Sequence, residues 1–476
     1  MSVECCWECC RDVAGMFGMM AMAVWFVLLV SFLCEFGDGA GLSDPMLLIT
    51  NGELYTPLSR GRGSVLTGGG AIVAILGEGY PVENLTGLPV RVVDAGGGFV
   101  VPGLIDIHVH VTGGGGEMGP ASRTPEGTVG EIVDAGITTV VGVLGTDCVS
   151  RSLENLRVKV AALQHQGITA HMWSGCYRVP SPTLTGSLIR DLQLIDEVVG
   201  AGEIAMSDHR SSWPTTQELL GLVTDARVGG MLSGKAGVVH FHTGSADSLL
   251  QPLWDVVNAS KGTIPLKHMI PTHVSGRGPA LLKAAEEWVS KGGRVDFTSD
   301  QEGETASHDA LMDWGKRMGN AALQGVSLSS DAFGSLPVFD SEGELVEYNV
   351  ASPKANLNTI RRLVLDGKWA LEDALQLSTT NPASHLSFKS KGKLEAGADA
   401  DIVILSPETL EVQYVIARGI VLKSPSVTSE RVGDCCRCSD EGLLSKKAPI
   451  LKTPSCIDQV SMVDEPLKEW KEAAQL

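Results

Sequence analysis

The sequence is short of positive charge, and its long central part is almost free of cysteine. Its 37 lysine and arginine residues face 56 acidic residues, and the net charge of −19 argues against nucleic acid or an anionic membrane surface as the main partner. Five cysteines lie before residue 35 and four after residue 434, which leaves only Cys148 and Cys176 between them. The central region is therefore not a disulfide scaffold, and the terminal spacings fit no zinc module. No P-loop sequence occurs, which excludes that class of nucleotide-binding fold.

The chain has 476 residues, enough for one large domain with an appendage or for two ordinary domains. Residues 1–44 form an N-terminal extension, in which the uncharged apolar run 13–34 is long enough to cross a bilayer. We expect this transmembrane or signal-peptide segment to anchor or target the protein. The alternative is a misassigned start codon, with a cytoplasmic protein that begins near Gly39.

Strand-like apolar runs alternate with helical patterns from residue 103 to about residue 386. The eight strand candidates are GLIDIHVH, ITTVVGVLG, ITAHMWSG, EIAMSD, GVVHFHTG, HMIPTHVS, GRVDFTSD and VSLSSDAF. Helical spacing follows in stretches such as 215–226, 279–291 and 306–318. Eight such alternations predict an α/β fold, a parallel (β/α)8 barrel over residues 102–386 rather than an open doubly wound sheet.

Two further β-rich segments flank the predicted barrel. Residues 45–101 contain short strand-like runs separated by Gly, Pro and Asn, and residues 387–423 are again β-rich. We expect them to join as a small β-sandwich domain built from both ends of the chain. Residues 424–476 are polar and irregular in composition and are predicted to form a tail.

Potential metal ligands recur where the predicted barrel strands end. His108 and His110 lie two residues apart, so they point to the same side of an extended strand. Taken alone, this pair fits two hydrogen-bonded sheet histidines as well as half of a metal site. The chemistry of a (β/α)8 barrel gathers at the carboxyl ends of its strands. The predicted ligands there are His108, His110, Glu203, His242, His273 and Asp331. This set suits one or two Zn²⁺ ions.

The chain resembles the amidohydrolase superfamily from about residue 47 to residue 422. The resemblance rests on VVPGLIDIHVH, on the His–His–Asp series of strands five, six and eight, and on GKLEAGADADIVIL. Within the superfamily it resembles most the isoaspartyl (β-aspartyl) dipeptidase family. The strings that carry this narrower resemblance are GGGGEMGPASRTPE, VLGTD, SGCYRVPSPTLTGS, SDHRSS and SSDAFGSLPVFDSEG.

The resemblance implies a dinuclear zinc hydrolase that cleaves the β-peptide bond of isoaspartyl dipeptides. One ion would be held by His108, His110 and Asp331, and the other by His242 and His273. A hydroxide that bridges the ions would be the nucleophile, with its pKa lowered to roughly 7. Asp331 would take its proton and pass it to the leaving amine. Tyr177 would help to polarise the scissile carbonyl.

The same resemblance assigns the recognition of a small charged dipeptide. Glu117, in the glycine loop with Gly115, would accept the substrate ammonium. Thr146 and Ser335 would hydrogen-bond the aspartyl carboxylate. Arg210 and Arg277 would bind the carboxylate of the leaving residue, since a guanidinium matches a carboxylate with two parallel hydrogen bonds. The resemblance also implies a homo-oligomer.

The chain departs from the family at two positions. Glu203 stands where the family has a carbamylated lysine that bridges the metals, so we expect the glutamate carboxylate to be the bridge. Lys235 is the nearest other lysine and has the sequence context of a structural turn. Arg277 lies one place later than in the family pattern, which weakens its assignment.

Other functions remain open from the sequence alone. A dihydroorotase, hydantoinase or D-aminoacylase would keep the metals but need other loops. A non-catalytic amidohydrolase-like scaffold would need none of the metal ligands.

Overall fold

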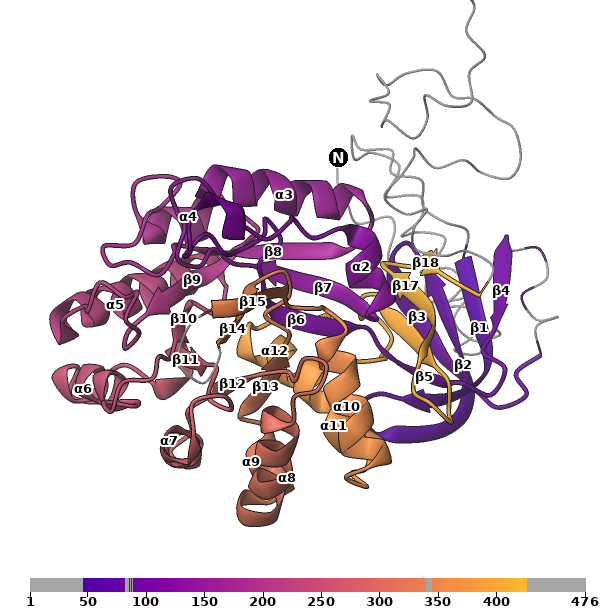
Figure 1. Cartoon of the computed structure of the whole chain (residues 1–476). Helices are drawn as coiled ribbons and strands as arrows, with labels where there is room; N and C mark the ends of the chain where they lie inside the picture. The colour runs from indigo at the N-terminus through magenta and orange to yellow at the C-terminus, as the bar shows by residue number, and fades with distance from the viewer. Residues whose placement is uncertain (1–45, 82–84, 86, 88, 340–344, 426–476) are drawn as a thin grey trace, which may run out of the picture.

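The computed structural model describes residues 46–425, apart from residues 82–84, 86, 88 and 340–344. Within this range the chain forms a barrel of parallel strands and a β-sheet that lies beside it (Figure 1). The expected C-terminal tail falls almost wholly outside the described residues.

Eight parallel strands form the barrel, as the sequence predicts. Six of them are hydrogen-bonded in the order β11-β10-β9-β8-β7-β6, and β12 pairs with β13. Backbone hydrogen bonds join the two groups on both sides, from Val274 N to Asp296 O at 3.5 Å and from His110 N to Ala332 O at 2.9 Å. The strands are β6 (Leu104–Val109), β7 (Ile137–Gly142), β8 (Thr169–Ser174), β9 (Val198–Ala205), β10 (Val238–His242), β11 (Met269–Thr272), β12 (Val295–Thr298) and β13 (Val326–Ser329).

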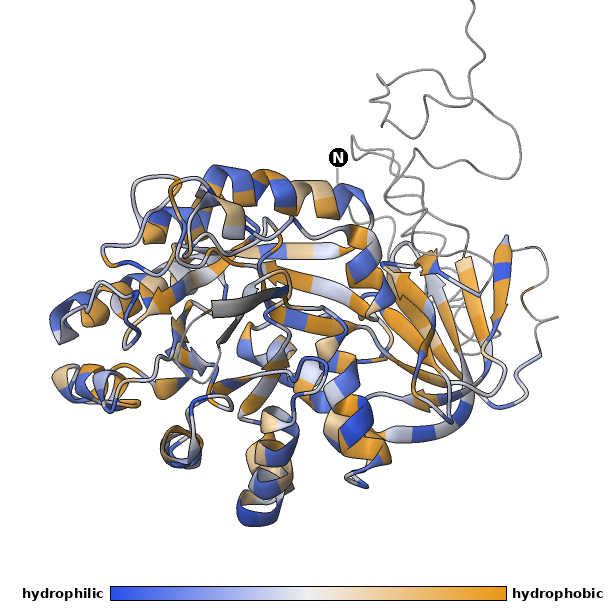
Figure 2. Cartoon of the chain, in the orientation of Figure 1, coloured by the Kyte–Doolittle hydropathy of each residue, from blue (hydrophilic) through white to orange (hydrophobic). Residues whose placement is uncertain are grey.

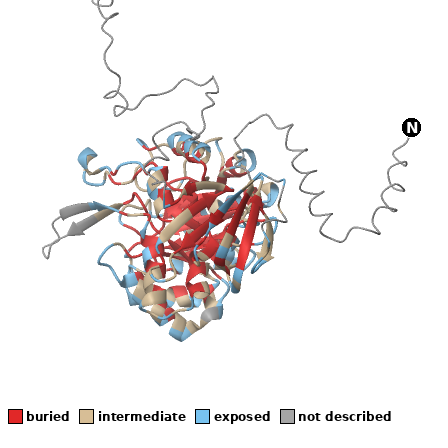
Figure 3. Cartoon of the chain, turned by 90° about the vertical axis from the view of Figure 1, so that its right-hand side faces the viewer, coloured by how far each residue is buried: buried red, intermediate tan, exposed pale blue. Residues whose placement is uncertain are grey.

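Six of the eight barrel strands are buried along their whole length, and β8 and β12 along most of it, because helices cover them on the outside. Every residue of β6, β7, β9, β10, β11 and β13 is buried, as expected for parallel strands with both faces covered (Figure 3). This explains why their sequences read as continuous apolar runs. The polar residues that interrupt those runs therefore need partners inside the barrel.

Helices connect the strands and turn their apolar side inward, as the striped ribbons of Figure 2 show. Capping boxes begin two of them, at Thr128 with Glu131 and at Thr215 with Glu218. The helices are α2 (Val129–Asp134), α3 (Leu153–His165), α4 (Leu188–Leu194), α5 (Thr216–Ser233), α6 (Gln251–Ala259), α7 (Pro279–Ser290), α8 (Ala306–Met318), α9 (Asn320–Leu323), α10 (Ala355–Leu365), α11 (Leu371–Leu375) and α12 (Thr380–His385). Short 3-10 turns are η4 (Pro120–Ser122), η5 (Leu266–His268) and η6 (Gln376–Ser378).

Strands from both ends of the chain share one eight-stranded sheet, which confirms the predicted β domain. β16 pairs with β5, which in turn pairs with β1, so this contact joins the two ends. A separate apolar core that includes Ile49, Val65 and Ile402 packs on the sheet. The strands are β1 (Met46–Tyr55), β2 (Ser59–Gly68), β3 (Ala71–Gly77), β4 (Val90–Asp94), β5 (Phe99–Pro102), β16 (Ile402–Leu405), β17 (Val412–Ala417) and β18 (Ile420–Lys423).

Several details differ from the sequence prediction. β9 begins at Val198, five residues before the predicted start. The prediction missed the first half of this strand, VVGAG, because its two glycines give no strand signal. A hairpin of β14 (Ser335–Phe339) and β15 (Leu345–Val350) follows the last barrel strand and was not predicted. Cys148 and Cys176 form a disulfide, with their Cα atoms 6.0 Å apart.

The prediction of a membrane-spanning anchor is corrected here. Across the part of the chain that the structure describes, no helix combines the length and the apolar character that crossing a bilayer requires. The apolar run 13–34, on which the membrane localisation rested, lies outside the described residues.

Candidate metal centre

Five strands carry the predicted metal ligands to one place at the carboxyl end of the barrel. His108 and His110 lie on and just after β6, Glu203 lies on β9, and His242 ends β10. His273 follows β11, and Asp331 lies just past β13. The side chains meet: His110 Nε2 is 3.0 Å from Asp331 Oδ1, and His273 Nε2 is 2.9 Å from Glu203 Oε1.

Glu203 lies between the two halves of this ligand set. Its Oε1 is 2.5 Å from His242 Nδ1 and 2.9 Å from His273 Nε2, whereas its Oε2 is 3.4 Å from His108 Nε2. The side chain is fully buried. One short carboxylate therefore reaches both predicted metal positions.

In the described part of the chain, buried polar atoms of these residues lack hydrogen bonds and converge on one point, which fits a bound metal ion. His108 Nε2, Glu203 Oε2 and Asp331 Oδ1 are buried and close to one another, yet within the described residues none of them makes a hydrogen bond of acceptable geometry. Unsatisfied buried polar atoms are costly, and here they converge. Ligand atoms within 4.8 Å of one another form the groups His108–Glu203–His273 and His108–His110–Asp331. Imidazole and carboxylate ligands are those that zinc binds in hydrolytic sites.

The electrostatics of the centre also favour a bound cation. Burial lowers the pKa of His108, but the charges of Glu203 and Asp331 outweigh it and raise the pKa to about 10. Burial raises the pKa of Glu203, but the charges of His108 and His242 bring it well below its usual value. The buried carboxylates thus hold their negative charge and require positive charge beside them.

Two ligand residues have a strained backbone. His273 has a φ of 61° and Asp331 a φ of 55°, the left-handed region that non-glycine residues rarely adopt. Such conformations cost about 1–3 kcal/mol each and cluster at functional sites. Two of the six predicted ligands have such a conformation, which the surrounding packing must stabilise. This favours a functional role for both residues.

A layer of buried residues behind the ligands was not predicted. His240 Nε2 lies 2.9 Å from His108 Nδ1, and the His240 ring stacks on Trp173. The Asp106 carboxylate accepts a hydrogen bond from His108 N at 3.2 Å. Asp296 accepts from hydroxyl groups of neighbouring strands. Two features of the sequence could have indicated this layer. One is the second His-x-His pair, His240 and His242 in β10, and the other is Asp106, two residues before the first pair. Such contacts orient metal ligands.

The predicted substrate residues line one large cavity of about 1190 Å³ beside the ligands. Arg210 Nη1 donates to Glu117 Oε1 at 3.3 Å, and Thr146 Oγ1 donates to the same oxygen at 3.1 Å. The Tyr177 hydroxyl is 2.9 Å from His242 Nδ1. The cavity is also lined by Gly115, Arg277 and Ser335. Of these, Arg277 is exposed, and in the described structure no hydrogen bond or ion pair joins it to the other predicted residues.

Asp208 is a further residue of the cavity that sequence reasoning missed, although it lies in the quoted string SDHRSS. Its two carboxylate oxygens accept from Arg210 Nε at 2.9 Å and Nη2 at 3.0 Å. Oδ2 also lies 3.0 Å from His242 Nε2. Because Asp208 contacts both a predicted metal ligand, His242, and the predicted carboxylate-binding arginine, it joins the two parts of the site.

A glycine leaves room where the loop after β7 lies against the predicted ligands. A Cβ atom on Gly145 would lie 3.1 Å from His110 Cε1 and 3.7 Å from the Tyr177 ring. The first distance is tighter than ordinary van der Waals contact, so a side chain at this position would require the ring of His110, a predicted ligand, to shift. Lys235, the alternative lysine, lies between α5 and β10 and donates to Ile195 O at 2.6 Å. It precedes its strand, so it is at the opposite end of the barrel from the ligands.

Comparisons with known proteins identify the family and the fold. The Amidohydrolase family model matches residues 294–425. A β-aspartyl dipeptidase from Fervidobacterium islandicum AW-1, solved in complex with β-Asp-Leu dipeptide, is 40% identical with a TM-score of 0.76. That similarity covers 83% of this chain and 99% of the dipeptidase. A solved enamidase, 15% identical with a TM-score of 0.55 over 80% of this chain and 96% of its own, shares the fold.

Curated relatives are more distant. An adenine deaminase from Latilactobacillus sakei is 23% identical over 399 residues, which are 78% of this chain. The chain spans 57% of the length of that deaminase. A deacetylase from Agrobacterium fabrum is 23% identical over 79% of this chain and 86% of its own length. On the strength of the 40% identical dipeptidase, which it matches almost end to end, this chain belongs to the amidohydrolase superfamily of hydrolases, within the isoaspartyl dipeptidase family.

Proposed function

We propose that this protein hydrolyses β-aspartyl dipeptides at a centre of two zinc ions. The observation that carries the proposal is the Arg210–Glu117 ion pair, at 3.3 Å, in the cavity beside the metal ligands. A zwitterionic dipeptide presents an ammonium group to a carboxylate and a carboxylate to a guanidinium. Each of the two residues would exchange its protein partner for an oppositely charged group of the substrate.

His108, His110 and Asp331 would hold one ion, and His242 and His273 the other, with Glu203 shared between them. The ions would supply Lewis acidity and a water that is activated at neutral pH. We assign the proton transfer to Asp331, whose side chain lines the cavity and whose Oδ1 lies 3.4 Å from His108 Nε2 and 3.0 Å from His110 Nε2. It would accept a proton from the attacking water and give it to the leaving amine.

The other cavity residues would orient the substrate. The Tyr177 hydroxyl, 2.9 Å from His242 Nδ1, would donate a hydrogen bond to the scissile carbonyl as negative charge develops there. Burial and the nearby Glu203 charge keep the pKa of Tyr177 well above its usual value, so the hydroxyl keeps its proton. Thr146, Ser335 and the loop of Gly115 would contact the aspartyl end, and Arg277 at the exposed rim would assist Arg210.

A substrate panel tests the proposal. Purified protein is incubated with β-Asp-Leu, α-Asp-Leu, dihydroorotate, a hydantoin, an N-acetyl-D-amino acid and adenine. We expect turnover of β-Asp-Leu, its loss after treatment with a chelator, and its return with added Zn²⁺. Metal analysis of the active protein should find zinc. Faster turnover of another compound in the panel would replace the dipeptidase proposal, and chelator-resistant hydrolysis would contradict the metal centre.

A further inference from the structure

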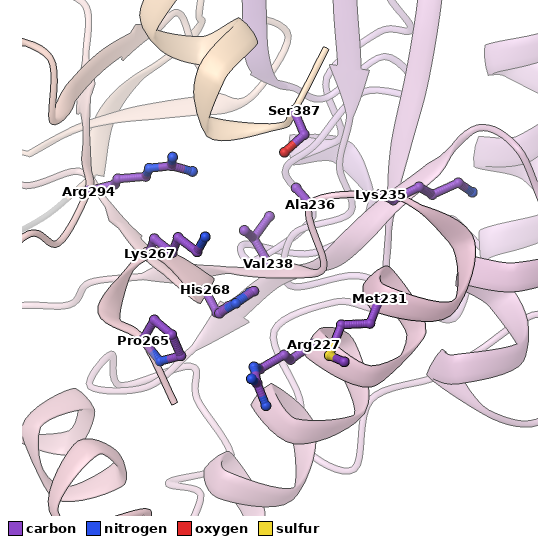
Figure 4. Close-up of a pocket in the computed structure, with 10 residues that line it drawn as sticks. All are labelled: Arg227, Met231, Lys235, Ala236, Val238, Pro265, Lys267, His268, Arg294 and Ser387. Atoms are coloured by element: carbon purple, nitrogen blue, oxygen red, sulfur yellow. The ribbon is translucent and has the colours of Figure 1, made fainter. Parts of the chain in front are cut away.

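A second hollow, of about 340 Å³, lies at the end of the barrel opposite the metal ligands. Its wall includes Val238, the first residue of β10, whereas the last residue of that strand is His242. His268 comes directly before β11 and Arg294 directly before β12. In a parallel barrel the amino ends of the strands meet at one face. The pocket, whose lining residues Figure 4 shows, shares no residue with the cavity beside the predicted metal ligands and is therefore separate from it.

This hollow, called the basic pocket below, is lined by an unusual set of charges. Its residues are Arg227, Met231, Lys235, Ala236, Val238, Pro265, Lys267, His268, Arg294 and Ser387. Four are permanent cations at neutral pH and one is a histidine. Among the described residues no carboxylate lines the pocket. This local concentration of cations contrasts with the net charge of −19 of the whole chain.

One of the four cations, Lys235, has a hydrogen-bond partner within the protein. The Lys235 amine donates to Ile195 O at 2.6 Å, and the charges of Asp196 and Glu197 oppose the lowering of its pKa by burial. Figure 4 shows its side chain extending away from the other cations. Lys235 therefore forms part of the wall and leaves the other four groups to face the hollow.

The remaining cations lack an acidic partner. Arg294 is half-buried and donates from Nη1 to His385 O at 2.9 Å; burial lowers its pKa, with no carboxylate charge to offset that. In the described structure no hydrogen bond or ion pair occupies Arg227 or Lys267. Burial lowers the pKa of His268, and the charges of Lys267, Arg227 and Arg294 lower it further. The cations are thus close enough to repel a positive charge at His268.

Placing several cations together without a counter-charge costs free energy, which an anion in the hollow would recover. Arginine side chains bind phosphate oxygens with two parallel hydrogen bonds, and lysine adds a point charge. We propose that the basic pocket binds a phosphate group, either of free inorganic phosphate or of a small phosphate ester. This assignment is independent of the dipeptidase proposal, because none of the pocket residues lines the cavity at the metal ligands.

Calorimetric titration of the full-length, metal-loaded protein tests this site. Inorganic phosphate and glycerol phosphate are titrated at constant ionic strength, with chloride as the reference anion. The variant Arg227→Gln/Lys267→Gln should bind both at least tenfold more weakly than the unmodified protein. The matched control Lys283→Gln/Lys316→Gln removes two exposed cations from α7 and α8 and should bind as the unmodified protein does. Tighter binding of one probe identifies the source of the phosphate.

The outcomes separate the basic pocket from other anion sites. Equal affinity in the unmodified protein and in Arg227→Gln/Lys267→Gln would place the binding elsewhere, such as at the metal centre, and overturn the proposal. Absence of binding in the unmodified protein would overturn it as well. Arg294→Gln is a second variant that should weaken binding in the same way. Circular dichroism verifies that each variant is folded before titration.

Discussion

Asp208 connects the predicted metal ligands of the cavity to the residues proposed to bind the substrate. It accepts from two nitrogens of Arg210 and contacts His242 Nε2 at 3.0 Å. An asparagine keeps the size of the side chain but loses the charge and one acceptor. Hydrogen bonds to charged groups are worth about 1.5–3 kcal/mol, which corresponds to about 10- to 140-fold in binding.

We therefore expect Asp208→Asn to raise KM for β-Asp-Leu about tenfold or more, with a smaller fall in kcat. Steady-state kinetics measures both. Asp147→Asn is the matched control, since Asp147 lines the same cavity but bonds Ser150 and Arg123 instead. A fall in kcat at unchanged KM would mean that Asp208 acts through His242 rather than through Arg210.

Glu203 provides the second residue-scale prediction. Replacement by glutamine removes the negative charge while keeping the shape, so the oxygen near His242 and His273 no longer offsets metal charge. We expect Glu203→Gln to lose at least half of its bound metal and to lose activity by more than 100-fold. Metal analysis after gel filtration measures the first effect. Glu304→Gln, a carboxylate of the same cavity, should keep its full metal content. Full metal retention in Glu203→Gln would contradict the bridging role.

At the scale of single elements, the sequence predicts strands better than it predicts contacts between loops. The period-two spacing of His108 and His110 places both on one side of β6, and the eight alternations lead to the barrel. The spacing cannot show that Arg210 meets Glu117, which lies 93 residues away in the chain. That contact depends on how two loops fold over the barrel mouth. The early start of β9 was missed because glycine gives no strand signal.

The disulfide is an example of such a loop contact. Cys148 and Cys176 are 28 residues apart, and they meet because each lies shortly after one of two neighbouring strands, β7 and β8. The bond joins the loop after β7, which carries Thr146, to the loop after β8, which carries Tyr177, and both residues are predicted to contact the substrate. Its position therefore links the stability of this segment to the geometry of the cavity.

Replacing both cysteines, Cys148→Ser/Cys176→Ser, should lower the free energy of unfolding by about 2–4 kcal/mol, because the unfolded chain gains freedom. Urea unfolding under oxidising conditions measures the change. Dithiothreitol should destabilise the unmodified protein by a similar amount and leave the variant unchanged. Equal sensitivity of both proteins to the reductant would show that the bond contributes nothing.

At the scale of the whole molecule, the two ends of the barrel differ in charge. Carboxylates and histidines gather at the mouth, and the basic pocket occupies the opposite end. β10 connects them, since Val238 lines the basic pocket and His242 lies at the mouth. The homo-oligomer that the family resemblance implies stays a prediction, which light scattering can test.

Buried histidines near the basic pocket make the stability of the whole fold depend on pH. His385 is fully buried, and its Nε2 lies 3.2 Å from Gln324 O. Burial, together with the charge of Arg294, lowers its pKa to about 3. Unfolding exposes this histidine and returns its pKa to about 6.5. The unfolded chain therefore binds a proton that the folded protein excludes. The contribution of neutral, buried His385 to the free energy of unfolding is fully present above about pH 6.5 and is lost as the pH falls towards 3.

His385→Gln should reduce this pH dependence, because glutamine can donate to Gln324 O without binding a proton. Between pH 7.5 and pH 5, the loss in unfolding free energy should be smaller in the variant by about 2 kcal/mol. Urea unfolding at the two pH values measures the difference. His165→Gln, at an exposed position on α3, should behave as the unmodified protein does. An equal loss in His385→Gln and in the unmodified protein would assign the acid sensitivity to other groups.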